Sequence, residues 1–184
     1  MSNLSQSNLS NSSLRSTEQT INNQFLKFLL YPDTKAMLPI GQVTEVLKIQ
    51  FGQIVPIPQM SSWVMGVYNW RGDILWMVDL GYLLGLNSWY HQQSNRSSYT
   101  AIVLSPYRES QGDNTTNHVH LGLVVAQVSD LEVCPPQAIQ ASLGSTSSPR
   151  LEQFLTGYWL KPDGEMILAL NSQAIAAAMP TNSS

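Results

Sequence analysis

Charged side chains are scarce in this sequence. Only 11% of its 184 residues are Asp, Glu, Lys or Arg, against about 25% in an average globular domain. With 9 basic and 12 acidic residues, the net charge is −3, so the chain lacks the positive field that nucleic-acid binding requires. A surface with few charges repels partners little and favours an interaction protein, although a compositional habit of the source lineage would explain the same number.

Cysteine and long apolar runs are also scarce. Cys134 is the only cysteine, so no internal disulfide can form, and we expect a cytoplasmic protein. No run approaches the ~18 consecutive apolar residues of a membrane span. Residues 1–23 are mainly Ser, Asn, Gln and Thr, without the features of a secretory signal. We expect this tail to be disordered, because it cannot bury enough apolar surface to offset its ordering entropy.

From residue 24 onward, many short strands alternate with turns. Apolar and alternating patterns predict strands at residues 25–30, 35–38, 43–49, 66–70, 74–79, 99–104, 118–125, 128–133, 158–160 and 166–170. Short helices are expected at residues 80–86 and from Ser172, as N-cap, through Ala178. Residues 54–58, 87–98, 106–117 and 135–149 are expected to be connectors or loops. This organisation indicates an all-β fold, a barrel or a sandwich, with few short helices.

Two parts of the sequence also predict the same order of local structures. Residues 66–80 and 157–171 each predict a hairpin that runs into a short helix, and residues 43–46 resemble residues 128–131. The offsets between the matching segments are 91 and 85 residues. Two related five-strand units would explain this repetition.

The residues that could carry catalysis are not arranged for it. His118 and His120 would face the same side of one predicted strand, but a metal site needs three or four ligands and no others lie near in sequence. Cys134 has no neighbouring His to activate it, and the nucleophile-elbow and phosphate-loop motifs are absent. We therefore expect no enzyme, metal or cofactor. A metal-dependent enzyme using His118 and His120 is the less favoured alternative, which metal analysis of the purified protein would test.

Arg71 stands beside Gly72 in the predicted turn between residues 70 and 74. A guanidinium at a hairpin tip either pairs with a carboxylate, for which Glu45 is the obvious candidate, or points into solvent. An exposed pair contributes only about 0–1 kcal/mol, but the planar fork of donors would orient a partner. The residues alone do not decide whether Arg71 pairs with a carboxylate or points into solvent.

These segments resemble, in order and spacing, the CheW-like domain. The strongest signal is the run Gly66-Val67-Tyr68-Asn69-Trp70-Arg71-Gly72, followed by Val78-Asp79-Leu80. The resemblance extends over residues 25–30, 40–47, 54–58 and 63–80, and in the second half over residues 101–104, 121–125, 128–130 and 157–170.

The resemblance implies two SH3-like five-stranded β-barrels packed together around a shared core. The CheW-like domain would cover residues 24–180, with a first barrel at about 24–86, a linker at 87–98 and a second barrel at about 99–180. CheW-like proteins are non-catalytic adaptors that join the cytoplasmic tips of chemoreceptors to the regulatory domain of a CheA-type histidine kinase. The family therefore implies a role in chemotaxis-like signalling that controls motility, without a nucleic-acid partner and without direct membrane insertion.

Positions carried over from the family define two candidate surfaces. A kinase-binding edge would include Glu45 and Leu47. A groove between the barrels would receive the helical receptor tip, as an apolar helix face is received in other grooves. This receptor-binding groove would include Val43, Gly66, Asn69, Arg71 and Gly72 from the first barrel and Thr100, Ala101, Gly122 and Val128 from the second.

The chain departs from the family pattern in its long Ser/Asn tail, in Pro39 and Gly81, and in the long loop at residues 106–117. These departures raise the hypothesis of a subfamily that serves type IV pilus motility or phototaxis. A second hypothesis within the family is a docking module that binds a kinase or response regulator but no receptor.

Overall fold

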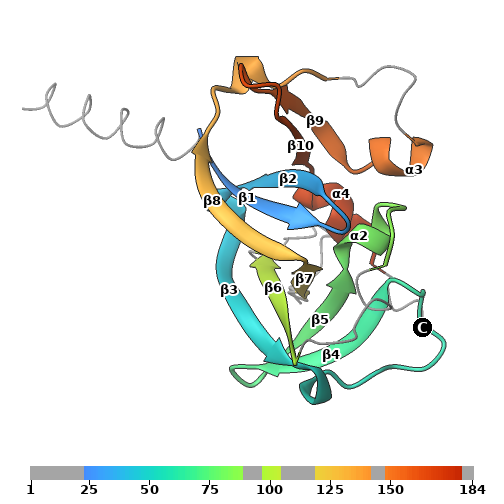
Figure 1. Ribbon diagram of the computed structural model, residues 1–184. Helices are drawn as coiled ribbons and strands as arrows, with labels where there is room; N and C mark the ends of the chain where they lie inside the picture. Colours follow the sequence, from blue (N-terminus) through green and yellow to red (C-terminus); the bar gives the residue numbers. More distant parts are fainter. Residues whose placement is uncertain (1–22, 89–96, 105–118, 142–147, 180–184) are drawn as a thin grey trace, which may run out of the picture.

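The computed structural model describes residues 23–88, 97–104, 119–141 and 148–179. Within these ranges the chain is mostly β-structure with a few short helices (Figure 1). The strands are β1 (Gln24–Leu30), β2 (Thr34–Pro39), β3 (Val43–Gln50), β4 (Val64–Trp70), β5 (Asp73–Asp79), β6 (Ser98–Leu104), β7 (His120–Val125), β8 (Gln127–Val133), β9 (Leu155–Leu160) and β10 (Met166–Leu170). The helices are α2 (Leu80–Leu83), α3 (Pro149–Glu152) and α4 (Ser172–Ala177), with 3-10 turns η1 (Ile40–Gln42), η2 (Phe51–Gln53) and η4 (Pro136–Ala138).

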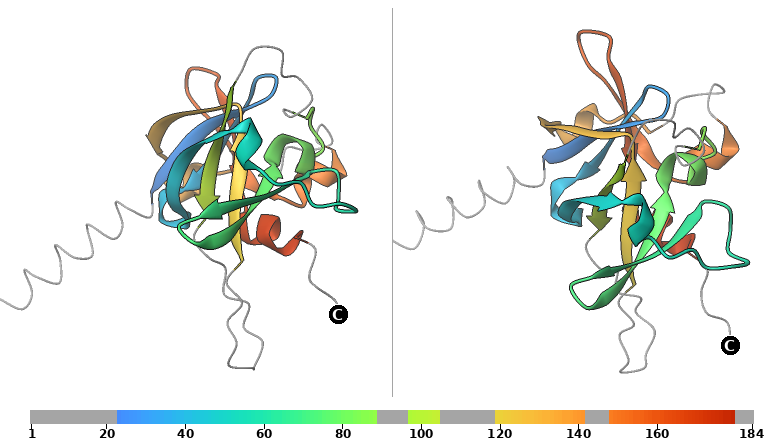
Figure 2. Two further views of the ribbon diagram at one scale, coloured as in Figure 1. Left: turned by 90° about the horizontal axis from the view of Figure 1, so that it is seen from below. Right: turned by 60° about the horizontal axis from the view of Figure 1, so that its bottom comes forward.

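The expected all-β class is confirmed. The strands form two five-stranded sheets, which we call sheet 1 (order β8-β1-β2-β10-β9) and sheet 2 (order β3-β6-β7-β5-β4). In Figure 1, sheet 1 lies above sheet 2, and Figure 2 shows the same arrangement from two other sides. Each sheet contains one parallel pairing, β10 with β2 in sheet 1 and β5 with β7 in sheet 2.

The expected boundary between the barrels does not match the sheets and needs correction. Sheet 1 combines β1 and β2 with β8, β9 and β10, whereas sheet 2 combines β3, β4 and β5 with β6 and β7. Neither sheet is therefore built from residues 24–86 or 99–180 alone. The chain holds two five-strand units, β1–β5 and β6–β10, that have exchanged their first two strands. Local patterns predict strands and hairpins, but they do not say which distant strands pair.

The predicted repetition extends to backbone detail. Both the β4–β5 hairpin and the β9–β10 hairpin contain a register shift beside a glycine, Gly66 in one and Gly157 in the other. At each shift a connecting segment bridges to the hairpin, Val55 to Val67 and Gln140 to Tyr158. The carbonyl of the connecting segment occupies the space that a side chain on either glycine would need.

Both hairpins run into a helix whose first turn is capped by a side chain. The carboxylate of Asp79 accepts a hydrogen bond from the Tyr82 backbone N–H, and the amide oxygen of Asn171 accepts from Gln173 and Ala174. The predicted cap at Ser172 is thus wrong by one residue. A side-chain oxygen at this position satisfies amide groups that the helix itself leaves unpaired.

Alternate residues of the strands pack into separate apolar clusters. The central cluster lies between the sheets and includes Phe28 and Leu168 of sheet 1 and Val78 and Leu123 of sheet 2. The opposite faces bury two smaller clusters, one around Leu75 and Met77 in sheet 2 and one around Met37 and Ile167 in sheet 1. Each central strand is therefore apolar on both sides, which follows from the two-residue period of a strand. No helix in the described part of the chain is long and apolar enough to cross a membrane.

Replacing Gly66 or Gly157 by alanine is expected to destabilise the fold. The added Cβ would lie 2.2 Å from the Val55 carbonyl oxygen in one case and 2.3 Å from the Gln140 carbonyl oxygen in the other. The backbone must then shift, and such overpacking costs about 1–3 kcal/mol. Urea unfolding measures the loss, with Gly41→Ala as control because nothing lies within 4 Å of its added Cβ. Equal stability of all three variants would contradict this account.

Candidate protein-docking site

The tip of the β4–β5 hairpin is held against β3 by one carboxylate. Arg71 Nη2 lies 3.0 Å from Glu45 Oε2, and the Trp70 indole N–H donates to the other oxygen of the same carboxylate. The guanidinium carbon of Arg71 also lies 5.2 Å from the centre of the Trp70 ring. The predicted pair between Arg71 and Glu45 is confirmed. The Arg71 side chain is 69% exposed and that of Glu45 only 24%, so the anchored guanidinium remains largely open to solvent.

The backbone of the turn fixes where this guanidinium stands. Arg71 has φ +56° and Gly72 has φ +94°, as the two central residues of a type I′ hairpin turn require. The Asn69 side chain accepts a hydrogen bond of 3.2 Å from the Gly72 N–H. The structure therefore brings Asn69, Arg71 and Gly72 together at one exposed tip, beside Glu45.

Behind this tip, His120 packs its ring edge against Trp70, with ring centres 5.1 Å apart. The Nδ1 atom of His120 is buried and has no hydrogen-bond partner among the residues that the structure describes. His118 lies outside the described residues. Among those that are described, no group of three His, Cys, Asp or Glu side chains could hold a metal ion. The structure thus assigns His120 an aromatic packing role.

The two residues of the predicted kinase-binding edge lie on β3, an outer strand of sheet 2. Glu45 and Leu47 are two positions apart and share one face, where they lie opposite Val103 and Ala101 of β6. Leu47 is half-buried and packs against the cluster inside sheet 2.

The remaining predicted groove residues divide into two groups. Val43 on β3 and Val128 on β8 are half-buried at the margin of the central cluster, and Thr100 on β6 is half-buried as well. Ala101 and Gly122, in contrast, are buried within sheet 2. Their burial leaves no surface on these two residues for direct contact with a partner.

Gly122 and Gly66 shape the sheet from inside. A Cβ on Gly122 would lie 2.8 Å from the Met77 sulfur, and Gly66 occupies the bulge beneath Val55 described above. Side chains at these positions would distort the strands that carry Arg71.

Sequence reasoning missed a second charged cluster, on sheet 1. Glu132 lies 2.5 Å from Lys27 and 3.1 Å from Lys161, while Glu165 lies 2.7 Å from Lys35 and 3.1 Å from Lys161. The five side chains come from separate strands and a turn. Lys161 and Glu165 are close in sequence, but sequence spacing contains no signal for their contacts with Lys27, Lys35 and Glu132, which β1, β2 and β8 supply.

This charged cluster shifts the acidity of its carboxyl groups. Hydrogen bonds from Lys35 and Lys161 lower the pKa of Glu165 from 4.5 to about 2. A hydrogen bond from Lys27 is the largest cause that lowers the pKa of Glu132. Both carboxylates therefore stay charged in the folded chain well below the pH at which they would take up protons in the unfolded chain.

These features define a protein-docking module: two sheets share a core, and an outer strand carries an oriented Arg–carboxylate tip. The sequence matches the family described as "CheW-like domain" over residues 24–179. The chain therefore belongs to the CheW-like family, whose members are non-catalytic scaffolding adaptors. No curated protein matches the chain.

The fold is also that of a solved CheW. The chain is similar to the scaffolding protein TtCheW from Thermoanaerobacter tengcongensis, with a TM-score of 0.62 and 22% sequence identity. The match covers 82% of this chain and 89% of that one. At this identity the likeness establishes the shared architecture of two packed five-stranded sheets.

The charged cluster predicts how stability depends on pH. Because Glu165 has a folded pKa of about 2 against an ordinary 4.5, its contribution to the free energy of unfolding is complete above about pH 5 and is lost as the pH falls toward 2. Urea unfolding at pH 7, 4 and 3 measures the free energy of unfolding. Between pH 7 and pH 3 this free energy should fall less for Glu165→Gln than for wild type. Asp130→Asn, which changes an exposed carboxylate on β8, should lose as much stability as wild type. An unchanged acid profile for Glu165→Gln would contradict the assignment.

Proposed function

We propose that this protein couples the cytoplasmic tips of chemoreceptors to the regulatory domain of a CheA-type histidine kinase, in a chemotaxis-like pathway that controls motility. Family membership supports a coupling role in general. The observation that carries the specific proposal is the hairpin tip, where Glu45 receives both Trp70 and Arg71 and leaves the guanidinium exposed. Such a rigid fork of donors orients a partner without adding much affinity.

The kinase is proposed to bind along β3. Among the described strands, β3 is an outer strand of its sheet, and such an edge suits the addition of a partner's strand or barrel. Val46 is 43% exposed on this strand, and Glu45 lies beside it on the opposite face. An apolar contact flanked by one carboxylate fits a partner domain of the same fold.

The receptor is proposed to bind where the two sheets meet. Val43 and Val128 border the central cluster there, and they occupy matching positions in the two repeated units, 85 residues apart. A helical hairpin needs an apolar strip of this kind with polar groups at its end. In this proposal the polar end is the tip formed by Asn69, Arg71 and Gly72.

We also propose that the pathway operates in the cytoplasm and that its output is pilus-driven or light-directed movement. The departures from the family pattern support this kind of output, and a genetic neighbourhood without pilus or photoreceptor components would count against it. The competing hypothesis is a docking module that binds a kinase or response regulator and no receptor, which binding to a receptor tip distinguishes from a coupler.

For the kinase, we expect micromolar binding to the regulatory domain from the same organism, weakened about threefold to tenfold by Glu45→Ala or Leu47→Ala. A loss of about 1 kcal/mol corresponds to a factor near five. Calorimetry measures the affinity, and circular dichroism checks that Leu47→Ala remains folded. Asp130→Ala is the matched control, because Asp130 occupies the position on β8 that Glu45 occupies on β3. Absence of binding by folded wild type would refute the coupling function.

For the receptor, Arg71→Ala should weaken binding to a receptor tip fragment by about threefold to tenfold, because the oriented donors are lost. Lys48→Ala removes the same charge from an exposed position on β3 and should have little effect. Surface plasmon resonance with the immobilised fragment compares the two variants. Equal affinities of Arg71→Ala and wild type would show that the hairpin tip is not part of the receptor site.

A further inference from the structure

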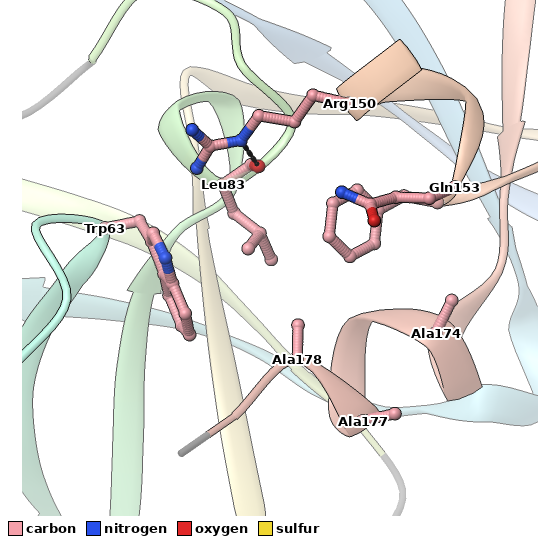
Figure 3. Close-up of a pocket in the computed structure, with 8 residues that line it drawn as sticks. Trp63, Leu83, Arg150, Gln153, Ala174, Ala177 and Ala178 are labelled. Carbon is pink, nitrogen blue, oxygen red and sulfur yellow. Dashed lines mark hydrogen bonds between the residues drawn. The ribbon is translucent and has the colours of Figure 1, made fainter.

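A pocket of about 520 Å³ opens between the three helices and the start of β4 (Figure 3). It lies at the seam of the fold, since α2 follows β5 of sheet 2 whereas α3 precedes β9 and α4 follows β10 of sheet 1. None of the residues assigned above to the kinase or the receptor lines it. The lining residues are Trp63, Leu83, Arg150, Gln153, Phe154, Ala174, Ala177 and Ala178.

The Arg150 side chain is fixed in place by a backbone carbonyl. Its Nε donates a hydrogen bond of 2.9 Å to the Leu83 carbonyl oxygen, which joins α3 to α2. The aliphatic part of Arg150 packs beside Gly85, where an added Cβ would lie 3.1 Å from the Arg150 Cδ. The two terminal nitrogens of the guanidinium have no partner among the described residues, so a positioned cation remains available at one end of the pocket (Figure 3).

Two neutral groups stand near this cation without partners of their own. The Trp63 residue is only 9% exposed. Its indole N–H has no acceptor within the part of the chain that the structure describes, and the nitrogen is not one of the fully buried unpaired atoms, so it stays accessible from the pocket. Figure 3 shows the ring nitrogen at the Arg150 end of the pocket and the Gln153 amide across from it. No acidic side chain lines the pocket.

The opposite side of the pocket is apolar. It consists of the Phe154 ring, the Leu83 side chain and three alanine methyl groups, two on α4 (Ala174 and Ala177) and one just after it (Ala178). A volume of about 520 Å³ lies within the range of about 300–1,000 Å³ that holds single small ligands. The space is therefore large enough for one small ligand with a compact apolar group.

We propose that this pocket binds a carboxylate joined to a compact apolar group. The carboxylate would accept hydrogen bonds from the Arg150 guanidinium and the Trp63 indole, and the apolar group would rest on Phe154 and the alanines of α4. A free organic acid and the C-terminal residue of a polypeptide share this chemistry. The proposal goes beyond the coupling function and does not depend on it, because the pocket shares no residue with the proposed kinase and receptor surfaces.

The test compares 3-phenylpropionate with its neutral isostere 3-phenylpropanamide. Both are titrated into the folded wild-type protein while ¹⁵N–¹H spectra are recorded, and the Trp63 indole signal is identified by its absence in Trp63→Phe. We expect saturable shifts of that signal by the acid, with a Kd on the order of millimolar for so small a ligand, and at least tenfold weaker binding of the amide. Equal binding of acid and amide, or no shift with either, would overturn the proposal.

Arg150→Met then tests the cation while keeping the aliphatic stem. We expect binding of 3-phenylpropionate to fall at least tenfold, and an unchanged Kd would overturn the proposal. Lys161→Met is the matched control, since it removes a cation from sheet 1 and not from the pocket. If Arg150→Met fails to fold, the comparison of acid and amide on wild type decides alone.

A second arm separates the two sources of the carboxylate. The peptide acetyl-Gly-Gly-Phe is titrated with a free C-terminus and as its C-terminal amide. Binding of the free peptide at least as tightly as 3-phenylpropionate supports a chain terminus as the ligand, whereas preference for 3-phenylpropionate supports a free organic acid. Failure of both carboxylates to bind contradicts the proposal in either form.

Discussion

The central apolar cluster between the two sheets is the constraint on which the rest of the structure depends. Neither five-strand unit keeps its own first two strands, so each sheet is completed by the other unit. Phe28, Leu38 and Leu168 on one side and Ile102 and Leu123 on the other are buried only because both sheets are present. The two halves therefore cannot be separated without exposing this cluster, and surfaces built from both halves keep a constant geometry. An adaptor that must hold two partners in a set relation gains from such coupling.

On this shared scaffold, the two repeated units have diverged at matching places. Both have the glycine bulge, the bridging segment and the side-chain helix cap. Sheet 2, however, carries the Glu45–Trp70–Arg71 arrangement, whose guanidinium is exposed, whereas sheet 1 carries a network in which two carboxylates pair with three lysines. The same backbone thus presents an oriented cation on one sheet and, on the other, a surface whose charged groups are largely paired with one another. The two sides of the molecule can therefore be distinguished by a partner.

The seam between the sheets also explains where the pocket lies. Short helices follow the ends of β5 and β10 because Asp79 and Asn171 cap them, and α3 precedes β9. These helices are too short to fill the space between them, and the bond from Arg150 to the Leu83 carbonyl spans it. The lining residues come from both units, Trp63 and Leu83 from the first and the others from the second, so an occupant would contact both units at once.

Local patterns were enough for the strands, the hairpins, the repetition and the exposed tip. Alternating side chains and turn residues such as Arg71-Gly72 act over a few residues. The contact of Glu45 with Trp70 and Arg71, in contrast, joins β3 to the β4–β5 hairpin, and these strands are not neighbours in sheet 2. The pairing of β3 with β6 and of β1 with β8 could not be predicted, because many registers satisfy the same apolar pattern and only packing of the complete core selects one. For the same reason the burial of Ala101 and Gly122, the charged cluster around Glu165 and the pocket beside Arg150 emerge only in three dimensions, where strands distant in sequence become neighbours.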